Sequence, residues 1–154
     1  MPFRALNRRQ RKAIYRLIRA ELLPLARKRF PGLRADVAEL RARLALGKTL
    51  TVASGGKTVG FIHLIERKPA VWIDMLAVDR AHQGKGLGTR LLRRAERHAA
   101  AAGAKAMKLL VDAGNITAIR FYAQNGFAGI GYHPGLHCYE YVKSLDPMKK
   151  LPAG

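Results

Sequence analysis

The sequence has little cysteine and few acidic residues. Cys138 is the only cysteine among 154 residues, so an internal disulfide is excluded and a reducing compartment fits the composition. Ten Asp and Glu residues stand against 29 Lys and Arg, which gives a formal net charge of +19. No apolar run reaches membrane-spanning length, and the basic N-terminus lacks the apolar segment of a signal peptide. We therefore expect a cytoplasmic protein with no membrane partner.

The positive charge gathers in the first third of the chain. Residues 1–50 hold 14 basic and three acidic side chains. Such a surface attracts anions, among them nucleic acid, nucleotide phosphates, acidic proteins and anionic lipid. A surface that only keeps the protein in solution explains the same composition equally well. Charge therefore bears on partners and not on the fold.

The N-terminal third is predicted to be helical. Apolar residues at spacings of three and four predict a helix over residues 7–30, which Pro24 should bend or divide. A second helix runs to about Leu46, and Gly47 is placed to stop it. The residues expected to face inward are Ile14, Leu17, Ile18, Leu22 and Leu25 in the first helix and Val37, Leu40 and Leu44 in the second.

The rest of the chain alternates strands and helices. Residues 49–66 predict a hairpin that turns at Ser54-Gly55-Gly56-Lys57. Further strands are expected at 70–79, 105–112, 127–133 and 137–145, and further helices at 87–102 and 115–125. This order predicts an α/β (α+β) fold with a mixed, largely antiparallel sheet of six to seven strands flanked by helices. We expect one domain over 1–154, with a helical N-terminal segment over residues 1–47, a core over 48–145 and a tail over 146–154.

Three glycines, Gly84, Gly86 and Gly88, stand at alternate positions just before the helix expected at 87–102. Glycine there costs backbone entropy, which indicates that something needs the main chain bare and close. The spacing differs from the dinucleotide fingerprint G-x-G-x-x-G, and no lysine stands between Gly88 and Thr89 as in a P-loop. A strand end, a glycine turn and a helix N-terminus still form a phosphate-binding arrangement, with a plain tight turn as the alternative.

Two segments about 30 residues apart match patterns of one known family. The first is Gln83-Gly84-Lys85-Gly86-Leu87-Gly88, which fits Gln/Arg-x-x-Gly-x-Gly/Ala and follows "DMLAVDRAHQ". The second is "NITAIRFYAQNGF" (115–127), which fits Asn-x-x-Ala-x-x-(Phe/Leu)-Tyr-x-x-x-Gly-Phe. Both resemble the GNAT superfamily of acyl-CoA-dependent N-acetyltransferases. The resemblance covers roughly residues 50–143, and the N-terminal third departs from it, so the acceptor stays open.

The resemblance implies where acetyl-CoA binds. Two parallel strands, 70–78 and 105–111, would splay apart and hold the pantetheine arm, while the amides of residues 84–89 would hold the diphosphate. The residues so implied are Leu76, Ala77, Val78, Gln83, Gly84, Lys85, Gly86, Leu87, Gly88, Thr89, Asn115 and Tyr122. Asn115 is also a favoured helix N-cap, and the two roles are compatible. No metal is expected, because the histidines and Cys138 lack ligand spacing.

The resemblance also implies the proton transfers. The Tyr122 phenol would protonate the departing CoA thiolate, and a buried core tyrosine is the alternative. The acceptor amine, with a pKa of about 10.4, must lose a proton before it attacks. Asp74, inside an otherwise apolar strand, is the first candidate base, with Glu66 as its rival and Asp112 as a third. His63 is expected to be a packed strand residue.

These inferences predict an N-acetyltransferase that moves an acetyl group from acetyl-CoA to a primary amine of a small molecule or protein, by direct attack in a ternary complex. The alternative is a catalytically silent module of the same fold that binds nucleic acid or a ribosome through its basic surface. A third option is another acyl-CoA or a hydroxyl acceptor. Members of the family often dimerise, which leaves a homodimer open.

Overall fold

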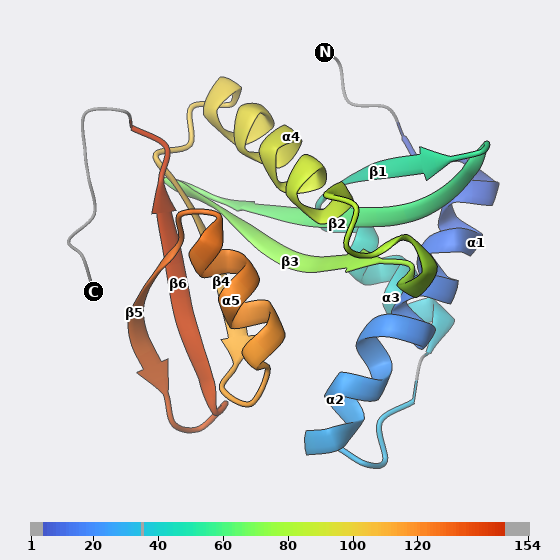
Figure 1. Cartoon of the computed structure of the whole chain (residues 1–154), viewed down its shortest axis with the longest axis horizontal. Coiled ribbons are helices and arrows are strands. Elements are labelled where there is room, and N and C mark those ends of the chain that lie inside the picture. The colour runs from blue at the N-terminus through green and yellow to red at the C-terminus, as the bar shows by residue number, and fades with distance from the viewer. Residues whose placement is uncertain (1–4, 35, 147–154) are drawn as a thin grey trace. The chain divides into compact units, whose positions relative to one another are not determined.

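Figure 1 shows the computed structural model of the chain, which describes residues 5–34 and 36–146. The helices are α1 (Arg8–Leu17), the π-helical segment η1 (Ile18–Leu22), α2 (Leu23–Arg29), α3 (Val37–Ala45), the 3-10 turn η2 (Arg80–His82), α4 (Leu87–Ala101) and α5 (Ile116–Gln124). The strands are β1 (Lys48–Ser54), β2 (Lys57–Arg67), β3 (Ala70–Val78), β4 (Ala106–Asp112), β5 (Ala128–His133) and β6 (Cys138–Ser144). Every helix and strand that the sequence predicts within these ranges is present.

The strands form one sheet in the order β1-β2-β3-β4-β6-β5. β1 pairs antiparallel with β2, and β6 pairs antiparallel with β4 and β5. β3 and β4 run parallel, and their ladder joins the first three residues of each strand, from Ala70↔Ala106 to Trp72↔Lys108. The predicted mixed, largely antiparallel sheet flanked by helices is therefore confirmed, with six strands. The tail predicted at 146–154 lies outside the described residues from 147 on.

The chain divides into two compact units. The first comprises Met1–Leu64 and Met75–Ala95, and the second comprises Ile65–Asp74 and Glu96–Gly154. The boundary crosses β2, β3 and α4, so each of these elements contributes residues to both units. A single domain over 1–154 stays a prediction.

The core of the first unit packs helix α1 against strands β2 and β3. Ile14 and Leu17 of α1 are 0 % and 1 % exposed, and they belong to one cluster with Phe61, Met75 and Ala77. Burial of such side chains contributes about 1.5–3 kcal/mol each. The spacing of three between the two α1 residues is the periodicity that predicts the helix, so here sequence pattern and packing agree.

Pro24 divides the first helix, as predicted. α1 ends at Leu17, the π-helical turn Ile18–Leu22 follows, and α2 continues with Pro24 in its first turn. Proline offers no N–H and its ring clashes with the carbonyl four residues earlier, and the wider π turn accommodates both effects. The extra residue of that turn shifts the phase of the apolar face. Leu25 is consequently 44 % exposed while Leu23 is buried, so the inward placement predicted for Leu25 is wrong.

Val37 is the second apolar residue that the sequence places wrongly. It is 38 % exposed because it is the first residue of α3, next to the N-cap. Asp36 forms that cap, and its side chain accepts hydrogen bonds from the N–H groups of Ala38 and Glu39. The helix reaches the core further along, where Leu44 is buried.

The hairpin of β1 and β2 turns where the sequence predicts. Gly55 and Gly56 have φ values of 58° and 80°, the left-handed conformations that a two-residue type I′ turn requires. Along the hairpin His63 is fully buried, and its Nε2–H donates to the Arg43 carbonyl at 3.1 Å. Its Nδ1 then accepts from the Thr49 hydroxyl at 3.0 Å. His63 is thus a packed strand residue, as predicted.

Position 47 needs a glycine mainly because β2 lies so close to it, and less because it follows a helix. A Cβ on Gly47 would overlap the Leu64 carbonyl and come within 2.9 Å of the His63 ring. We expect Gly47→Ala to lower the free energy of unfolding by about 1–3 kcal/mol, the usual range for overpacking. Chemical denaturation measures this. Gly32→Ala is the control, because a Cβ there meets nothing within 4 Å. Equal stability of the two variants would contradict this account.

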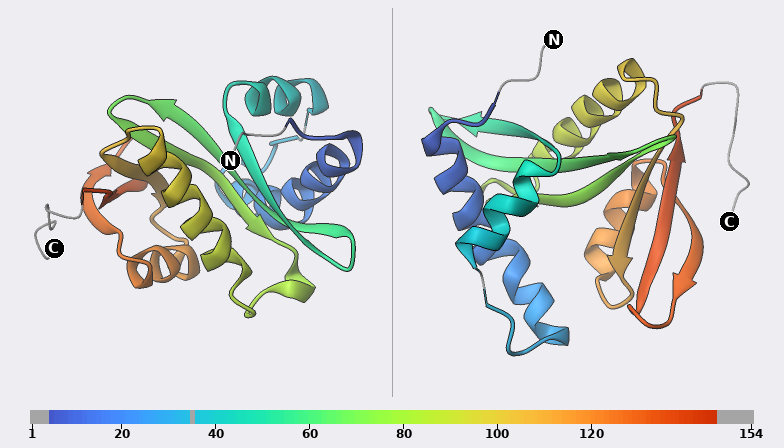
Figure 2. Two further views of the ribbon diagram at one scale, coloured as in Figure 1. Left: turned by 90° about the horizontal axis from the view of Figure 1, so that it is seen from above. Right: turned by 180° about the vertical axis from the view of Figure 1, so that it is seen from behind.

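The second unit is built on the antiparallel strands β4, β6 and β5, which Figure 2 shows from two further sides. β6 pairs with β4 from Ala106↔Ser144 to Asp112↔Cys138. Helix α5 and the turn before it connect β4 to β5. Lys143 of β6 donates from Nζ to the Glu96 carboxylate at 2.8 Å and to the Asn125 carbonyl at 2.9 Å, which ties the C-terminal half of α4 and the end of α5 to the sheet.

Candidate cofactor and catalytic sites

The glycine turn before α4 presents bare main chain. Gly84 and Gly86 have φ values of 77° and 81°, and both are exposed. A Cβ on either residue would meet no other atom within 4 Å, so no side chain of the described residues fills the space in front of them. These glycines are therefore needed for their backbone conformation and not for tight packing.

Helix α4 begins directly at this turn and points its N-terminus there. Its first helical hydrogen bond runs from the Arg90 N–H to the Gly86 carbonyl at 3.0 Å, so the amides before Arg90 have no acceptor within the helix. Leu91, Leu92 and Ala95 are fully buried and hold the helix in place. The first turn contains no acidic residue. The partial positive charge of the helix N-terminus therefore lacks a counter-anion from its own turn.

Gln83 fixes the turn to its surroundings. Its Nε2 donates to the Val78 carbonyl at 2.8 Å and to the Glu21 carboxylate at 3.3 Å. The side chain thus links the end of β3, the turn and η1 within the first unit. The resemblance implies that Gln83 binds the cofactor, which stays a prediction, and these contacts add a positioning role. The partner Glu21, 62 residues earlier, has no signal in the sequence.

In the first unit the main chain of β3 directs its polar groups to its two edges in alternation. The Asp79 N–H donates to the Val59 carbonyl at 2.7 Å, and the Ala77 carbonyl lies 3.2 Å from where a Cβ on Gly60 would stand. Odd-numbered residues therefore direct their polar groups towards β2. Because neighbouring strand residues direct these groups to opposite edges, Leu76 carries its N–H and carbonyl at the edge away from β2.

Asn115 begins α5 in the second unit. Its Oδ1 accepts from the Ala118 N–H at 3.2 Å, which is the N-cap bond that the sequence predicts. The side-chain Nδ2 remains a donor, since capping uses the oxygen alone. Asp112 shapes the turn before it, because its Oδ1 accepts from the Gly114 N–H at 2.8 Å. Asp112 stays the third candidate base as a prediction.

Tyr122 is held rigidly at the other end of α5. The Phe127 N–H donates to the Tyr122 carbonyl at 3.0 Å and the Gly126 N–H to the Ala123 carbonyl at 3.2 Å, which together form a Schellman cap. Gly126 supplies the required positive φ of 90°. The Tyr122 ring meets those of Phe121 and Phe127 edge-on, with centroids 5.2 and 5.6 Å away. The family-like pattern of residues 115–127 is thus a capped helix that fixes one phenol.

The Tyr122 phenol combines burial with an unused hydroxyl. The residue is 8 % exposed, and burial raises the pKa of its phenol well above the ordinary value. Within the range of residues that the structure describes, no hydrogen bond is made by the hydroxyl. The phenol therefore keeps its proton at neutral pH, and its hydroxyl can donate to a ligand.

The three candidate carboxylates lie in different settings. Asp74 is half-buried and shares one face of β3 with Trp72. Glu66 is exposed near the end of β2, where it lines a cavity of about 210 Å³ beside Pro69 and residues 102–104. Asp74 and Glu66 both belong to the second unit, and both make interactions within the chain. The geometry favours neither over the other.

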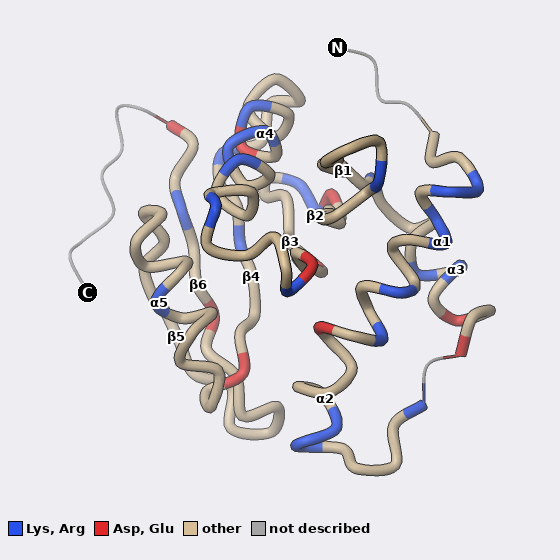
Figure 3. The backbone as a smooth tube through the Cα atoms, turned by 45° about the vertical axis from the view of Figure 1, so that its right-hand side comes forward, with Lys and Arg blue, Asp and Glu red and all other residues tan. Residues whose placement is uncertain are grey.

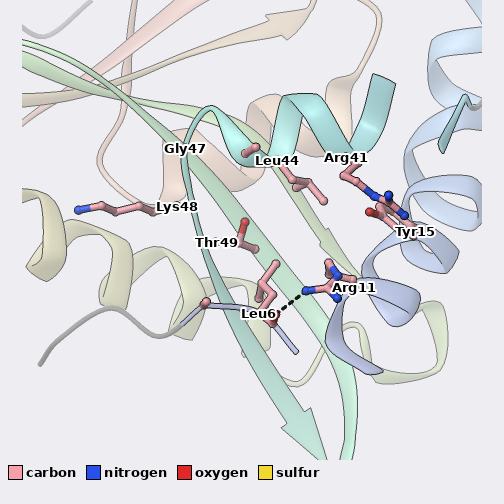
Figure 4. Close-up of a pocket in the computed structure, with 10 residues that line it drawn as sticks. Leu6, Arg11, Tyr15, Arg41, Leu44, Gly47, Lys48 and Thr49 are labelled. Carbon is pink, nitrogen blue, oxygen red and sulfur yellow. Dashed lines mark hydrogen bonds between the residues drawn. The ribbon is translucent and has the colours of Figure 1, made fainter. Parts of the chain in front are cut away.

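A larger cavity, of about 300 Å³, lies in the first unit between α1, α3 and β1 (Figure 4). Arg11, Tyr15, Arg41 and Lys48 line it together with the apolar residues Leu6 and Leu44. Arg11 donates to the Leu6 carbonyl at 2.7 Å. None of the residues that the sequence assigns to a site lines this cavity.

The residues of the glycine turn fit a diphosphate. Open space stands before Gly84 and Gly86, the helix amides follow, and Lys85 adds an exposed cation. For a metal, residues 5–34 and 36–146 hold no cluster of three or more His, Cys, Asp or Glu side chains that could bind one. In the same ranges no helix is both long and apolar enough to cross a membrane.

A mixed sheet with a parallel central pair, and a glycine turn leading from one of its strands into a helix, is the architecture of a class of acyltransferases. A sequence model of the acetyltransferase (GNAT) family matches residues 12–127 of this chain. The chain belongs to that family, which confirms the resemblance seen in the two sequence segments. A search of curated protein sequences gave no match.

Solved structures show the same fold. The ribosomal-protein-S18-alanine N-acetyltransferase from Escherichia coli is similar with a TM-score of 0.74 and 16 % identity, over 98 % of this chain and 97 % of that one. Aminoglycoside 6′-acetyltransferase type Ii is similar with a TM-score of 0.75 and 19 % identity, over 97 % of this chain and 100 % of that one. The PaiA N-acetyltransferase from Thermoplasma acidophilum, solved with coenzyme A, is similar with a TM-score of 0.72 and 18 % identity, over 92 % of this chain and 96 % of that one.

Proposed function

We propose that the protein transfers an acetyl group from acetyl-CoA to a primary amine of a small molecule or protein in a ternary complex. The observation that carries this proposal is the turn at Gly84 and Gly86, whose open face and positive φ values suit a diphosphate. Membership of the acetyltransferase (GNAT) family and the coenzyme A complex of the PaiA enzyme support it.

In this proposal the chain holds the co-substrate through its main chain. The amides of residues 84–89 bind the diphosphate and Lys85 adds charge. The β3 segment of residues 76–78 binds the pantetheine arm through the N–H and carbonyl of Leu76. Asn115 donates from Nδ2 to the same arm. Acetyl-CoA supplies the acyl group as a thioester, which an amine attacks at the carbonyl carbon. The Leu76 N–H donates to the carbonyl oxygen as negative charge builds there.

Two side-chain roles complete the reaction. The attacking nitrogen forms a bond to the carbonyl carbon while the carbon–sulfur bond breaks, and a carboxylate takes the proton of the amine. We assign that proton to Asp74 or Glu66, directly or through water. Tyr122 donates its hydroxyl proton to the leaving sulfur. Burial raises the pKa of the phenol and keeps it protonated at neutral pH, so it meets the developing thiolate as a hydrogen-bond donor, and solvent returns its proton after CoA leaves.

The net charge and the cysteine content support proposals about the acceptor substrate and the cellular location. A net charge of +19 repels free polyamines and favours amines carried by anionic molecules. One cysteine in 154 residues suits the cytoplasm, where we place the protein. A homodimer stays a prediction from the habit of the family.

Calorimetry with acetyl-CoA tests the co-substrate, and release of free thiol with a panel of amines and peptides tests the transfer. We expect heat and a thermal shift with acetyl-CoA, and far weaker binding of acetyl-pantetheine, which lacks the diphosphate. No heat and no shift at millimolar acetyl-CoA would overturn the proposal. Binding without transfer to any amine would favour the catalytically silent module instead.

A further inference from the structure

Helix α1 presents a row of positive charge along one side. Arg8, Lys12 and Arg16 of α1 and Arg19 of the following segment η1, called the cationic row here, are spaced four, four and three residues apart and are all exposed. At 3.6 residues per turn Arg8, Lys12 and Arg16 lie within about a quarter of the α1 circumference and extend over about 12 Å, and Arg19 follows within the next turn. Figure 3 shows this basic character along α1 and into α2. Residues 5–20 contain no Asp or Glu.

The row is held in a fixed orientation and is not neutralised within the chain. On the opposite side of the helix Ile14, Leu17 and Ile18 are buried in the core of the first unit. Among the residues that the structure describes, none of the four cations has an ion-pair or hydrogen-bond partner. The charges are therefore preorganised on a rigid helix and available to an external anion.

This arrangement works against the stability of the helix that carries it. Like charges four residues apart, as at Arg8, Lys12 and Arg16, destabilise a helix. The first turn of α1 holds Arg8 and Arg9 and no acidic residue, although the helix dipole favours acids there. A surface of mixed sign would keep the protein in solution without either effect. Such local conflicts are expected where a surface serves function.

We propose that the cationic row binds the sugar–phosphate backbone of a nucleic acid duplex, independently of the proposed acetyl transfer. A duplex carries one negative charge per about 1.7 Å of its axis, so it offers several phosphates along the length of the row. Three of the four cations are arginines, whose planar guanidinium groups bind phosphate through paired hydrogen bonds.

Other anionic partners fit this surface less well. A membrane-binding helix needs apolar residues to insert, and the apolar face of α1 is buried in the core. A protein partner needs an exposed apolar or aromatic anchor, and no large hydrophobic residue of Arg8–Arg19 is exposed. Backbone phosphates need only charge in the right places.

The test is fluorescence anisotropy of labelled duplexes of DNA and RNA, each of about 20 base pairs, with the full chain at increasing salt. In the row variant all four residues of the cationic row are changed to Gln. The control variant carries four other changes to Gln, which remove the same charge from exposed positions on other elements: Lys57→Gln, Arg67→Gln, Lys105→Gln and Arg120→Gln. For DNA we expect the row variant to lower the salt slope of log K by about 3–4 and the control variant by less than about one. The two duplexes show whether DNA or RNA is preferred.

Three outcomes would overturn the proposal. The first is an equal loss of duplex affinity in the two variants, and the second is no duplex binding by the parent at physiological salt. The third is binding of the parent to polyglutamate or anionic vesicles that is as tight as its binding to the duplex and depends as strongly on the cationic row. Thermal unfolding serves as the check on folding, because it does not depend on any ligand, and both variants should unfold cooperatively like the parent. Retained duplex binding in a protein that fails to bind acetyl-CoA would separate this inference from the proposed function.

Discussion

Replacing Gly86 by valine is expected to raise the dissociation constant of acetyl-CoA by about 100-fold or more, which corresponds to roughly 2.7 kcal/mol. The side chain would stand in the open space where the proposal places the diphosphate. It would also strain a backbone whose φ is 81° and so shift the amides that follow. Each charge-assisted hydrogen bond to a phosphate contributes about 1.5–3 kcal/mol, so the loss of one or two suffices. Calorimetry measures the change.

Gly55→Val is the matched control for this variant. Gly55 also has a positive φ, of 58°, and a Cβ there also meets nothing within 4 Å. Both variants should therefore lose similar stability, about 1–2 kcal/mol from the left-handed conformation. Only Gly86→Val should lose affinity for acetyl-CoA. Unchanged affinity in Gly86→Val, or equal weakening in both variants, would remove the turn from the cofactor site.

Tyr122→Phe is expected to lower kcat by about 100-fold or more, because a positioned proton donor contributes roughly 10²–10⁴ to a rate. Acetyl-CoA affinity should change little, since the ring and its contacts with Phe121 and Phe127 remain. Stability should also stay within about 0.5 kcal/mol, because the hydroxyl has no partner among the described residues. Single-turnover kinetics with an active acceptor measure the effect.

Tyr139→Phe controls for the loss of a tyrosine hydroxyl elsewhere in the second unit, at a residue that is 37 % exposed. It should turn over like the parent. Full activity of Tyr122→Phe would leave the phenol as a core residue. A small decrease that disappears with an acyl donor of lower thiol pKa would support proton donation, because a better leaving group needs less help.

Much of the fold follows from local patterns in the sequence. The hairpin at Gly55 and Gly56, the N-cap at Asn115 and the stop at Gly126 each depend on residues within a few positions, so their chemistry is visible without coordinates. The placement of Leu25 fails because it depends on how the chain accommodates Pro24. A shift in helix phase is not encoded in the apolar spacing itself.

In the candidate site, too, local motifs can be predicted from the sequence and tertiary contacts cannot. The glycine turn and Tyr122 are found from their motifs, and the structure gives each a physical basis in φ values, open space and a capped helix. The contact of Gln83 with Glu21 joins residues 62 positions apart, and Gly47 is required by a neighbouring strand. Tertiary contacts of this kind carry no local signature. The choice between Asp74 and Glu66 depends on such contacts too.

The most direct measurement is a crystal structure of the protein with coenzyme A. We expect the diphosphate oxygens to accept hydrogen bonds from main-chain amides between Gly84 and Thr89, and the sulfur to lie within reach of the Tyr122 hydroxyl. Coenzyme A bound instead in the cavity beside Arg11, Arg41 and Lys48, with the glycine turn free of phosphate, would contradict it.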